Sequence, residues 1–302
     1  MLKRTLSALL ALLTLLIPAL GYALPTIAWM SDTQQYSSAA SPMWAEMNNW
    51  ILDNREKLDI RYVFHTGDIV SASKSDKQWQ FAGEAMSFLS EGDMPFLAVT
   101  GNHDTGYRES YSRYMDYVGS LQPMHFAQEY SETGSRYELF TIDGRDYIFL
   151  GIAFSTRGPS QEECQWARDV LAKHSDRIAI ILTHSYIKRL TDYTTQGNVI
   201  FREIVQPSPN VLMVLCGHCR ELSRKADELD DDGDGTPDRT VYSLLTNFQA
   251  AKNGGDGYMR FLMFRHKEIC VYTYSPILDT YEYGREQTVD IIPLPPMEQN
   301  NG

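Results

Sequence analysis

Apolar runs separated by polar turns divide the chain into predicted strands and helices. Short apolar runs of strand length occur at residues 26–30, 60–64 and 96–99. Between them, residues 42–58 and 79–89 place apolar side chains at the spacing of a helix face. This part of the chain therefore predicts strands that alternate with helices.

The second half of the chain continues this pattern and then becomes richer in strands. Residues 139–154 predict two strands joined at the turn pair Asp143-Gly144, and residues 162–172 predict a helix. Further strands are expected at residues 177–182, 211–215, 240–245, 258–264 and 269–274. Alternating strands and helices before a β-rich tail indicate an α/β layered sandwich. Because no repeat or linker interrupts residues 24–302, we expect one domain there.

The first 23 residues have the composition of a secretory signal peptide. Two cations precede an apolar run over residues 6–20, and Gly21 and Ala23 are small residues at positions −3 and −1 of a cleavage site. A membrane anchor is the alternative, but the run is shorter than the roughly 20 residues of a spanning helix. We therefore expect cleavage after Ala23 and a secreted or periplasmic protein.

The charge balance restricts the classes of partner. The chain has 302 residues, with 27 Lys and Arg against 39 Asp and Glu, for a formal net charge of −12. This acidic balance argues against a nucleic-acid-binding protein, which neutralises phosphates with a basic surface. A phosphate-containing substrate remains compatible, because bound metal ions supply local positive charge.

Polar residues with ligand chemistry follow five of the predicted strands. They are Asp32 with Gln34, Asp68, Asn102 with His103 and Asp104, His184, and His218. Singly, an Asp after a strand is usually a cap or turn residue, and a lone His is usually a core residue. In open α/β sheets, however, the carboxyl ends of strands meet at one edge, where ligands bind. Oxygen and imidazole donors from five strands at that edge predict a metal site.

The order of these residues resembles the calcineurin-like metallophosphoesterases over about residues 26–275. The matching elements are Asp32-Thr33-Gln34, Gly67-Asp68, Gly101-Asn102-His103-Asp104, His184 and Gly217-His218, of which Gly-Asn-His-Asp is the most specific. The resemblance implies two mixed β-sheets flanked by helices and two divalent transition-metal ions, Mn, Fe or Zn. It also implies an enzyme that hydrolyses a phosphate ester through a metal-activated water or hydroxide.

The resemblance implies a role for each matching residue. One ion, at what we call the second metal site, has a complete ligand set consisting of the bridging Asp68, Asn102, His184 and His218. His103 is expected to protonate or stabilise the leaving oxygen, because an imidazole suits proton transfer near neutral pH. Asp104 is expected to orient the ring of His103.

The other ion has a reduced ligand set, which we call the first metal site. It retains Asp32, Gln34 and the bridging Asp68, but Gln34 replaces the histidine that the family usually carries. Arg220 stands where the family usually has a second histidine, and an arginine does not release its proton to bind a metal. We expect the first metal site to bind its ion weakly, or only when substrate phosphate adds oxygens. Arg220 then either clamps that phosphate or forms a surface ion pair.

Two other patterns suggest different chemistry. Cys216-Gly217-His218-Cys219 is also the redox motif of protein disulfide isomerases, in which a helix N-terminus lowers the pKa of the first thiol. Here the motif follows a predicted strand, so thiol–disulfide exchange through Cys216 and Cys219 is a remote alternative. A structural disulfide, two free thiols and Cys219 as a metal ligand all remain open.

The acidic segment 230–238 resembles extracellular calcium-repeat loops. Its candidate ligands for calcium are Asp230, Asp232, Asp234 and Asp238. Val241 occupies the position of the bidentate Glu of an EF-hand, so this is not an EF-hand loop. The alternative to a structural calcium site is a solvated acidic turn between two strands.

The reduced first metal site leaves a second function open, that of a non-catalytic phosphate- or metal-binding protein on the same fold. Occupation of this site by a second ion distinguishes the two functions. If the protein is a phosphoesterase, its partner is a phosphate ester, which is small or macromolecular and a monoester or a diester. No nucleic-acid-binding surface is expected, nor a membrane span after signal cleavage, and no sequence signal predicts an oligomeric state.

Overall fold

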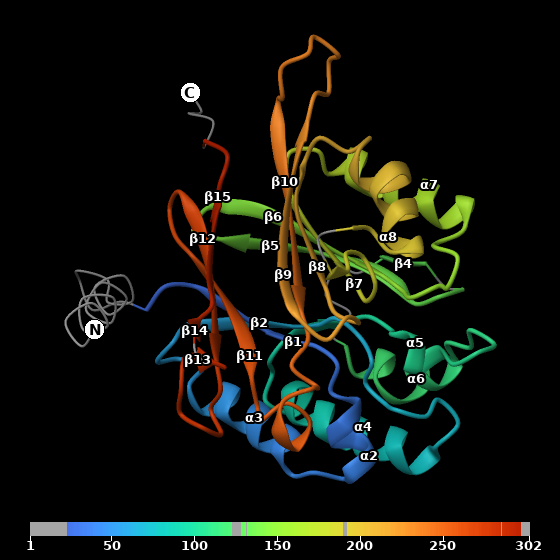
Figure 1. Ribbon diagram of the computed structural model, residues 1–302, viewed down its shortest axis with the longest axis vertical. Helices are drawn as coiled ribbons and strands as arrows, with labels where there is room; N and C mark the ends of the chain where they lie inside the picture. Colours follow the sequence, from blue (N-terminus) through green and yellow to red (C-terminus); the bar gives the residue numbers. More distant parts are fainter. Residues whose placement is uncertain (1–22, 123–127, 131, 190–191, 285, 297–302) are drawn as a thin grey trace.

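Two mixed β-sheets face each other and carry helices on their outer sides (Figure 1). The computed structural model describes residues 23–122, 128–130, 132–189, 192–284 and 286–296. The predicted signal peptide, apart from Ala23, lies outside these ranges. Within them, no helix has the length and apolar character needed to cross a bilayer.

The six-stranded sheet has the order β15-β12-β11-β1-β2-β3. Strands β1, β2 and β3 are parallel to one another, whereas β11, β12 and β15 pair antiparallel. The bounds are β1 (Thr26–Met30), β2 (Ile60–His65), β3 (Phe96–Ala98), β11 (Met259–Phe264), β12 (Glu268–Tyr274) and β15 (Val289–Pro293). The three parallel strands all end at the same edge of the sheet.

The seven-stranded sheet has the order β4-β5-β6-β7-β8-β10-β9. Strands β6, β7, β8 and β10 are parallel, and β4, β5 and β9 are antiparallel to their neighbours. The bounds are β4 (Gln128–Tyr130), β5 (Ser135–Ile142), β6 (Arg145–Ile152), β7 (Ile178–Thr183), β8 (Val211–Cys216), β9 (Leu222–Leu229) and β10 (Arg239–Thr246). Strands β13 (Glu282–Tyr283) and β14 (Glu286–Gln287) form a separate hairpin.

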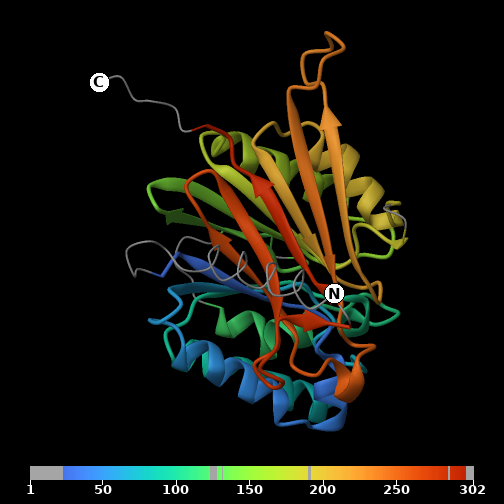
Figure 2. The same cartoon turned by 60° about the vertical axis from the view of Figure 1, so that its left-hand side comes forward.

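Helices cover the two outer faces of the sandwich. Figure 2 shows the N-terminal helices on the side of β1 and β2 that faces away from the seven-stranded sheet. The α-helices are α2 (Gln34–Ala39), α3 (Met43–Asp53), α4 (Asp76–Glu91), α5 (Asn102–Thr105), α6 (Ser112–Tyr117), α7 (Gln161–Lys173) and α8 (Thr195–Ile200). The short turns are η1 (Gly119–Leu121) and η4 (Lys252–Gly254), both 3₁₀, and η3 (Phe201–Val205), a π-turn.

Alternation along the strands produces the layers. In β1, Ile27 and Trp29 point into the core between the sheets, while Ala28 and Met30 point toward α3 and α4. Strands β7 and β8 divide their side chains in the same way between the inter-sheet core and α7 and α8. Because successive strand residues point to opposite faces, strands covered on both sides are apolar throughout. The predicted sandwich of two mixed sheets flanked by helices is confirmed.

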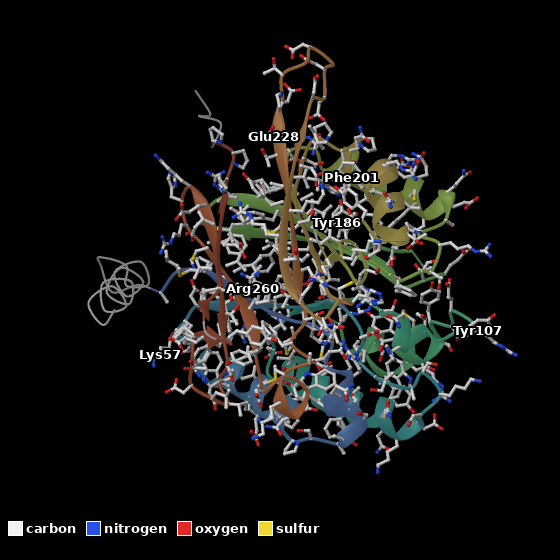
Figure 3. All side chains as sticks on the ribbon, viewed as in Figure 1. Lys57, Tyr107, Tyr186, Phe201, Glu228 and Arg260 are labelled. Atoms are coloured by element: carbon white, nitrogen blue, oxygen red, sulfur yellow. The ribbon has the colours of Figure 1, made fainter. Side chains whose placement is uncertain are left out.

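Differences from the sequence-based expectation are local. The helix expected over 42–58 ends at Asp53, where the Asn54 side chain donates to the Trp50 carbonyl and competes with the next helical hydrogen bond. Strand β9 was not predicted, because its residues are largely charged and lack apolar alternation. It is an exposed edge strand that pairs with β10 along its whole length (Figure 3), and charged side chains are common on such edges.

One buried carboxyl group lies in the inter-sheet layer. Glu138 on β5 is 4% exposed and accepts a hydrogen bond from the buried Tyr62 hydroxyl on β2. Its second oxygen has no hydrogen-bond partner among the described residues. Burial raises the pKa of Glu138 to about 7, although the Tyr62 hydrogen bond and the charge of Arg136 act in the opposite direction.

Replacing this carboxyl group by Glu138→Gln should change the pH dependence of stability. The folded protein keeps the proton on Glu138 above the usual pKa of an unfolded Glu, so this stabilising contribution is lost as pH rises through about 7. Relative to the variant, the free energy of unfolding of the unmodified protein should fall by about 2–3 kcal/mol between pH 5 and pH 8. Urea denaturation across this range measures it. Glu228→Gln, on the exposed face of β9, is the control, and parallel pH curves for the protein and Glu138→Gln would contradict the prediction.

Candidate metal centre

Side chains that follow parallel strands of both sheets meet at one end of the sandwich. Asp32 follows β1, Asp68 follows β2 and Asn102 begins α5 after β3. His184 and His218 follow β7 and β8 of the other sheet. The structure thus brings together donors from five strand ends and from both sheets, as the sequence pattern predicted.

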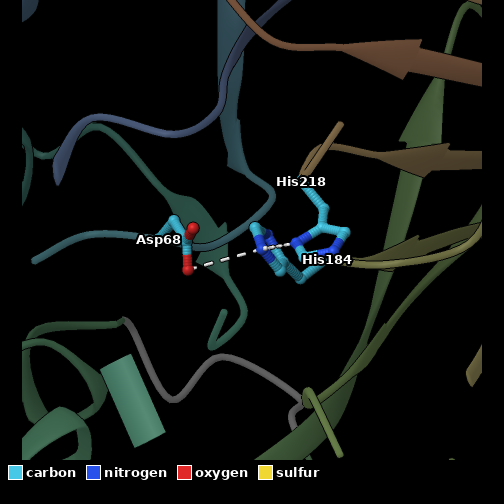
Figure 4. Close-up of side chains that lie close together, drawn as sticks. All are labelled: Asp68, His184 and His218. Carbon is cyan, nitrogen blue, oxygen red and sulfur yellow. Dashed lines mark hydrogen bonds and ion pairs between the residues drawn. The ribbon is translucent and has the colours of Figure 1, made fainter. Parts of the chain in front are cut away.

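The second metal site contains four donor atoms at short mutual distances, and Figure 4 shows the three residues Asp68, His184 and His218 that provide three of them. His184 Nε2 lies 3.4 Å from Asp68 Oδ1 and 3.2 Å from His218 Nδ1. Asn102 Oδ1 lies 3.1 Å from His184 Nε2 and 2.9 Å from His218 Nδ1. Donor atoms of Asp68, His184 and His218 all lie within 4.8 Å of one another.

The hydrogen bonds around this cluster test whether it fits a cation. His184 Nδ1 lies 2.8 Å from the Thr66 carbonyl, which only accepts, so Nδ1 carries a proton. In a neutral ring, Nε2 then presents a lone pair to the carboxylate of Asp68 and the amide oxygen of Asn102. Lone pairs that face one another in a buried site repel unless a cation lies between them. The donor set therefore fits a divalent transition metal with mixed nitrogen and oxygen ligands.

The pKa shifts of these groups also indicate that the site favours positive charge. Burial lowers the pKa of His184, but the charge of Asp68, the hydrogen bonds to Asp68 and Thr66 and the charge of Asp32 together raise that pKa to about 9. Burial also opposes ionisation of Asp68, yet the facing His184 holds the pKa of Asp68 below its usual range. Burial and repulsion from His184 lower the pKa of His218 to about 4. These shifts favour one positive charge beside Asp68, where a metal ion would also be stabilised.

The first metal site contains two carboxylates and two amides. Gln34 Nε2 lies 3.2 Å from Asp68 Oδ2 and 2.9 Å from Gln249 Oε1, and Gln249 Nε2 lies 3.5 Å from Asp32 Oδ1. Burial raises the pKa of Asp32 to about 7, a shift that His184 partly opposes and Asp68 reinforces. Sequence reasoning missed Gln249, although it follows a strand, β10, that is parallel to β8.

Backbone geometry at these residues is unusual. Asp32, Asp68 and His218 have positive φ angles of 56°, 56° and 74°. Residues other than glycine rarely adopt this left-handed backbone conformation. Non-glycine residues hold such angles at a cost of about 1–3 kcal/mol each, and they cluster at functional sites. Three of the predicted ligands share this strain, which supports a functional reason for their placement.

Two glycines of the matching motifs allow the backbone to approach the carboxylates. A Cβ atom on Gly101 would lie 2.2 Å from Asp68 Oδ1, and one on Gly217 would lie 2.3 Å from Asp32 Oδ2. Any side chain at either position would displace a carboxylate. The glycines of Gly-Asn-His-Asp and Gly-His are therefore required by close packing against the ligands.

The predicted role of Asp104 is wrong. Asp104 accepts hydrogen bonds from the backbone N–H groups of Ile69, Val70 and Gly101, at 2.7, 2.9 and 2.7 Å. It fastens the loop after β2 to the loop after β3. The ring of His103 instead lies with Nδ1 2.9 Å from the Ser71 carbonyl. A carboxylate beside three unpaired backbone donors binds them in preference to an exposed ring.

Arg220 and the four cysteines are now placed. The side chain of Arg220 is exposed and forms no ion pair with any residue that the structure describes, so of its two alternatives the surface ion pair is not seen and the phosphate clamp stays a prediction. Cys164, Cys216, Cys219 and Cys270 are free thiols. Cys216 ends a strand rather than beginning a helix, and burial raises its pKa to about 12. This thiol has the opposite character to a redox-active one.

The acidic loop joins β9 to β10 at an exposed tip. Carboxylates of Asp230, Asp232 and Asp238 lie within 4.8 Å of one another, and Asp234 does not belong to this group. Asp230 accepts hydrogen bonds from Gly233 N and Gly235 N, both at 2.7 Å, and thereby shapes the loop. The loop calcium site stays a prediction.

The two-sheet architecture and the ligand cluster at the strand ends are the features that the resemblance to the calcineurin-like metallophosphoesterases implied. The family model for calcineurin-like phosphoesterases matches residues 25–219, and the chain belongs to this family. The predicted family resemblance is thus confirmed. The chain is also 41% identical over 273 residues to the uncharacterized protein YvnB of Bacillus subtilis (strain 168), an alignment that covers 86% of this chain and 21% of YvnB. The chain therefore spans about a fifth of that relative.

Solved structures share the fold at low identity. GAP50, the anchor in the inner membrane complex of Plasmodium, has a TM-score of 0.58 and 12% identity, covering 91% of this chain and 90% of its own. Purple acid phosphatase PPD1 from yellow lupin (Lupinus luteus) seeds has a TM-score of 0.55 and 15% identity, covering 86% and 53%. These likenesses support the two-sheet fold.

Metal ions should stabilise the folded protein against heat. At free Mn²⁺ about 100-fold above its dissociation constant, the gain is about 2.7 kcal/mol, which for a chain of this size raises Tm by roughly 4–5 °C. Calorimetry with Mn²⁺ and with chelator measures this shift. In Asp68→Asn the carboxylate shared by both sites is lost, so most of the shift should disappear. An equal shift in that variant would place the stabilising ion elsewhere.

Proposed function

We propose that the protein is an exported metal-dependent phosphoesterase that hydrolyses a phosphate ester through a metal-activated water or hydroxide. One observation carries the proposal: carboxylate, imidazole and amide groups from both sheets converge on Asp68 in a buried site whose charge and donor set fit a cation. Family membership supports the choice of phosphate ester as substrate.

Residues at the two sites would hold two divalent transition ions, Mn, Fe or Zn. His184, His218 and Asn102 would bind one ion, Asp32 and Gln34 the other, with Asp68 shared between them. Ions bound here supply charge that stabilises phosphoryl oxygens and lowers the pKa of a water molecule. The carboxylates give the protein groups around the site little positive charge. Bound metal ions would therefore be the main source of positive charge next to a phosphate.

His103 is suited to act on the leaving group. Its backbone N–H donates to Asp68 Oδ1 at 2.9 Å, which places the residue beside the bridging carboxylate. The Ser71 carbonyl holds Nδ1–H, so Nε2 is the nitrogen available to carry a proton outward. The side chain is exposed, so a substrate can reach it. These features support a general acid that protonates the leaving oxygen.

The effect on kcat of removing the His103 imidazole should depend on the leaving group of the ester. For phenyl phosphate, whose leaving oxygen needs a proton, His103→Ala should lower kcat by about 10²–10³-fold. For p-nitrophenyl phosphate, whose phenolate leaves without a proton, the loss should be much smaller. Steady-state rates with both esters test this. His266→Ala, at the exposed turn between β11 and β12, is the matched control. Equal losses with both esters would contradict a general-acid role.

Substitutions that separate the metal centre from the thiols test the reaction class. We expect Asp68→Asn to abolish hydrolysis, because it removes the charge shared by both metal sites. Cys219→Ser, which removes the more exposed thiol of the Cys216–Cys219 pair, should leave the rate unchanged. A thiol–disulfide oxidoreductase would instead keep its exchange activity in Asp68→Asn and lose it in Cys219→Ser. Full hydrolytic activity in Asp68→Asn would exclude the proposed function.

A non-catalytic binding protein on the same fold is the second candidate. It is favoured by the reduced first metal site, where Gln34 and Arg220 occupy positions at which the resemblance leads one to expect imidazoles. GAP50, described as an anchor, shares the fold with this chain. This candidate predicts phosphate binding by calorimetry without hydrolysis of phosphate monoesters or diesters at any metal concentration.

Export remains part of the proposal and rests on the N-terminal sequence. The apolar run over residues 6–20 and the small residues up to Ala23 support cleavage at this point. The first contacts of the described fold lie just beyond it, where the Pro25 carbonyl accepts from Phe264 N at 2.8 Å. Mass spectrometry of the protein from the expressing cell should give an N-terminus at Leu24.

A further inference from the structure

Gln249 lies at the first metal site but belongs to none of the motifs that the family resemblance uses. It follows β10, which is parallel to β8, so its loop reaches the same end of the sandwich as the loop of His218. Its side chain is placed between Gln34 and Asp32, at 2.9 Å and 3.5 Å. A sixth strand end thus contributes a polar group to the metal centre.

We propose that Gln249 is a ligand of the first metal site, and that this all-oxygen site takes a harder cation than the second metal site. The inference rests on the proposed two-metal function and specifies which ion each site prefers. Mg²⁺ and Mn²⁺ belong to the class that oxygen ligands favour, whereas imidazole nitrogens favour Zn²⁺ and Fe.

The donors available at the first metal site are oxygens. Among the described residues, His, Cys, Asp and Glu donors form two close groups of three or more, and neither group includes Asp32. Arg220 carries no lone pair for a metal and its side chain is exposed. The groups next to Asp32 and Asp68 on this side are the amides of Gln34 and Gln249, whose nitrogens face these carboxylates in the structure. A cation between them would bind the amide oxygens, which rotation of each amide about its last side-chain bond brings to the same side.

The amide of Gln34 is incompletely satisfied in its present contacts. Its nitrogen donates to Asp68 Oδ2 and Gln249 Oε1, whereas its oxygen is buried and has no hydrogen-bond partner among the described residues. Gln34 is 2% exposed, so the unpaired oxygen has lost its contact with water without gaining a hydrogen bond, which carries a free-energy cost. Coordination of a cation by this oxygen would remove that cost.

The loop of Gln249 is tied to the second metal site. Asn247 Nδ2 donates to the His218 carbonyl at 3.1 Å, and Gln249 N donates to Asn247 Oδ1 at 2.9 Å. His218 N in turn donates to Asp32 Oδ2 at 3.2 Å. Asn247 is therefore a positioning residue that holds Gln249 against Asp32, so the position of the Gln249 amide does not depend on a free loop.

The two sites differ in charge as well as in donor type. The first metal site has one carboxylate of its own, Asp32, and shares Asp68, while its two amides are neutral. The second metal site has no carboxylate of its own but has two imidazoles. Neutral oxygen ligands bind Zn²⁺ less well than imidazoles do, because Zn²⁺ prefers nitrogen and sulfur. We therefore expect unequal ions rather than a matched pair.

The test measures metal binding directly, by isothermal titration of chelator-dialysed protein with Mn²⁺ and with Zn²⁺. We expect two Mn²⁺ per chain, and one tight Zn²⁺ with a second at least tenfold weaker. Gln249→Ala should weaken the second Mn²⁺ about 10–100-fold and leave the tight ion unchanged. Its side chain is half-buried, and unchanged Tm without metal shows that the variant folds.

Two further variants sharpen the test. Gln34→His introduces an imidazole and should raise the affinity of the first metal site for Zn²⁺ relative to Mn²⁺ at least tenfold. Gln35→Ala is the matched control, because this neighbouring amide forms no side-chain hydrogen bond with the described residues. Electron paramagnetic resonance should show a coupled Mn²⁺ pair in the control and its loss in Gln249→Ala.

The outcomes separate this inference from the proposed function. Unchanged affinity for both Mn²⁺ ions in Gln249→Ala would exclude Gln249 as a ligand while leaving the metal centre intact. Unchanged Zn²⁺ preference in Gln34→His would overturn the all-oxygen description of the first metal site. Failure of the proposed function has a different signature, which is metal binding by the unmodified protein without hydrolysis of any ester.

Discussion

Two buried carboxylates, Asp32 and Asp68, set the central constraint on this structure, because each is only 2% exposed and they lie in one site. Burying like charges side by side is unfavourable unless positive charge lies between or beside them. His184, whose Nε2 lies 3.4 Å from Asp68 Oδ1, supplies that charge when it is protonated, and the surrounding donors are arranged for a stronger cation. The convergence of strand ends from both sheets follows from this requirement.

Several residues around the two carboxylates have strained backbone conformations that keep the carboxylates in one site. Three of the predicted ligands adopt left-handed backbone angles, and the glycines beside Asp32 and Asp68 allow main chain to pass within contact distance. Asp104 then locks two of the loops together through three backbone hydrogen bonds. A rigid frame of this kind keeps donor atoms in place before an ion binds, which is how preorganised metal sites reach high affinity. The sandwich core supplies the stability that offsets this strain.

The two metal sites differ in their donors. One site has two imidazoles, whereas the other has the amides of Gln34 and Gln249, and Gln34 stands where the resemblance leads one to expect a histidine. On the inference proposed above, the neutral amides replace nitrogen donors by oxygen donors, so the site would change its metal preference while keeping its shape. This interpretation reconciles a reduced motif with a buried, well-packed site, and it places weight on Gln249, which lies 215 residues from Gln34 in the chain.

The sequence by itself determined most of the strands, the layered α/β class and the ligands that directly follow strands, such as Asp68 and His184, because local apolar periodicity and strand-end position are written in consecutive residues. Only the tertiary structure decided which nearby groups satisfy one another. Asp104 turned to backbone donors of a neighbouring loop instead of to His103, and Gln249 reached Asp32 from a strand that sequence reasoning assigned to the β-rich tail. Such pairings depend on which distant strand ends lie next to each other in the fold, and local sequence patterns do not predict that.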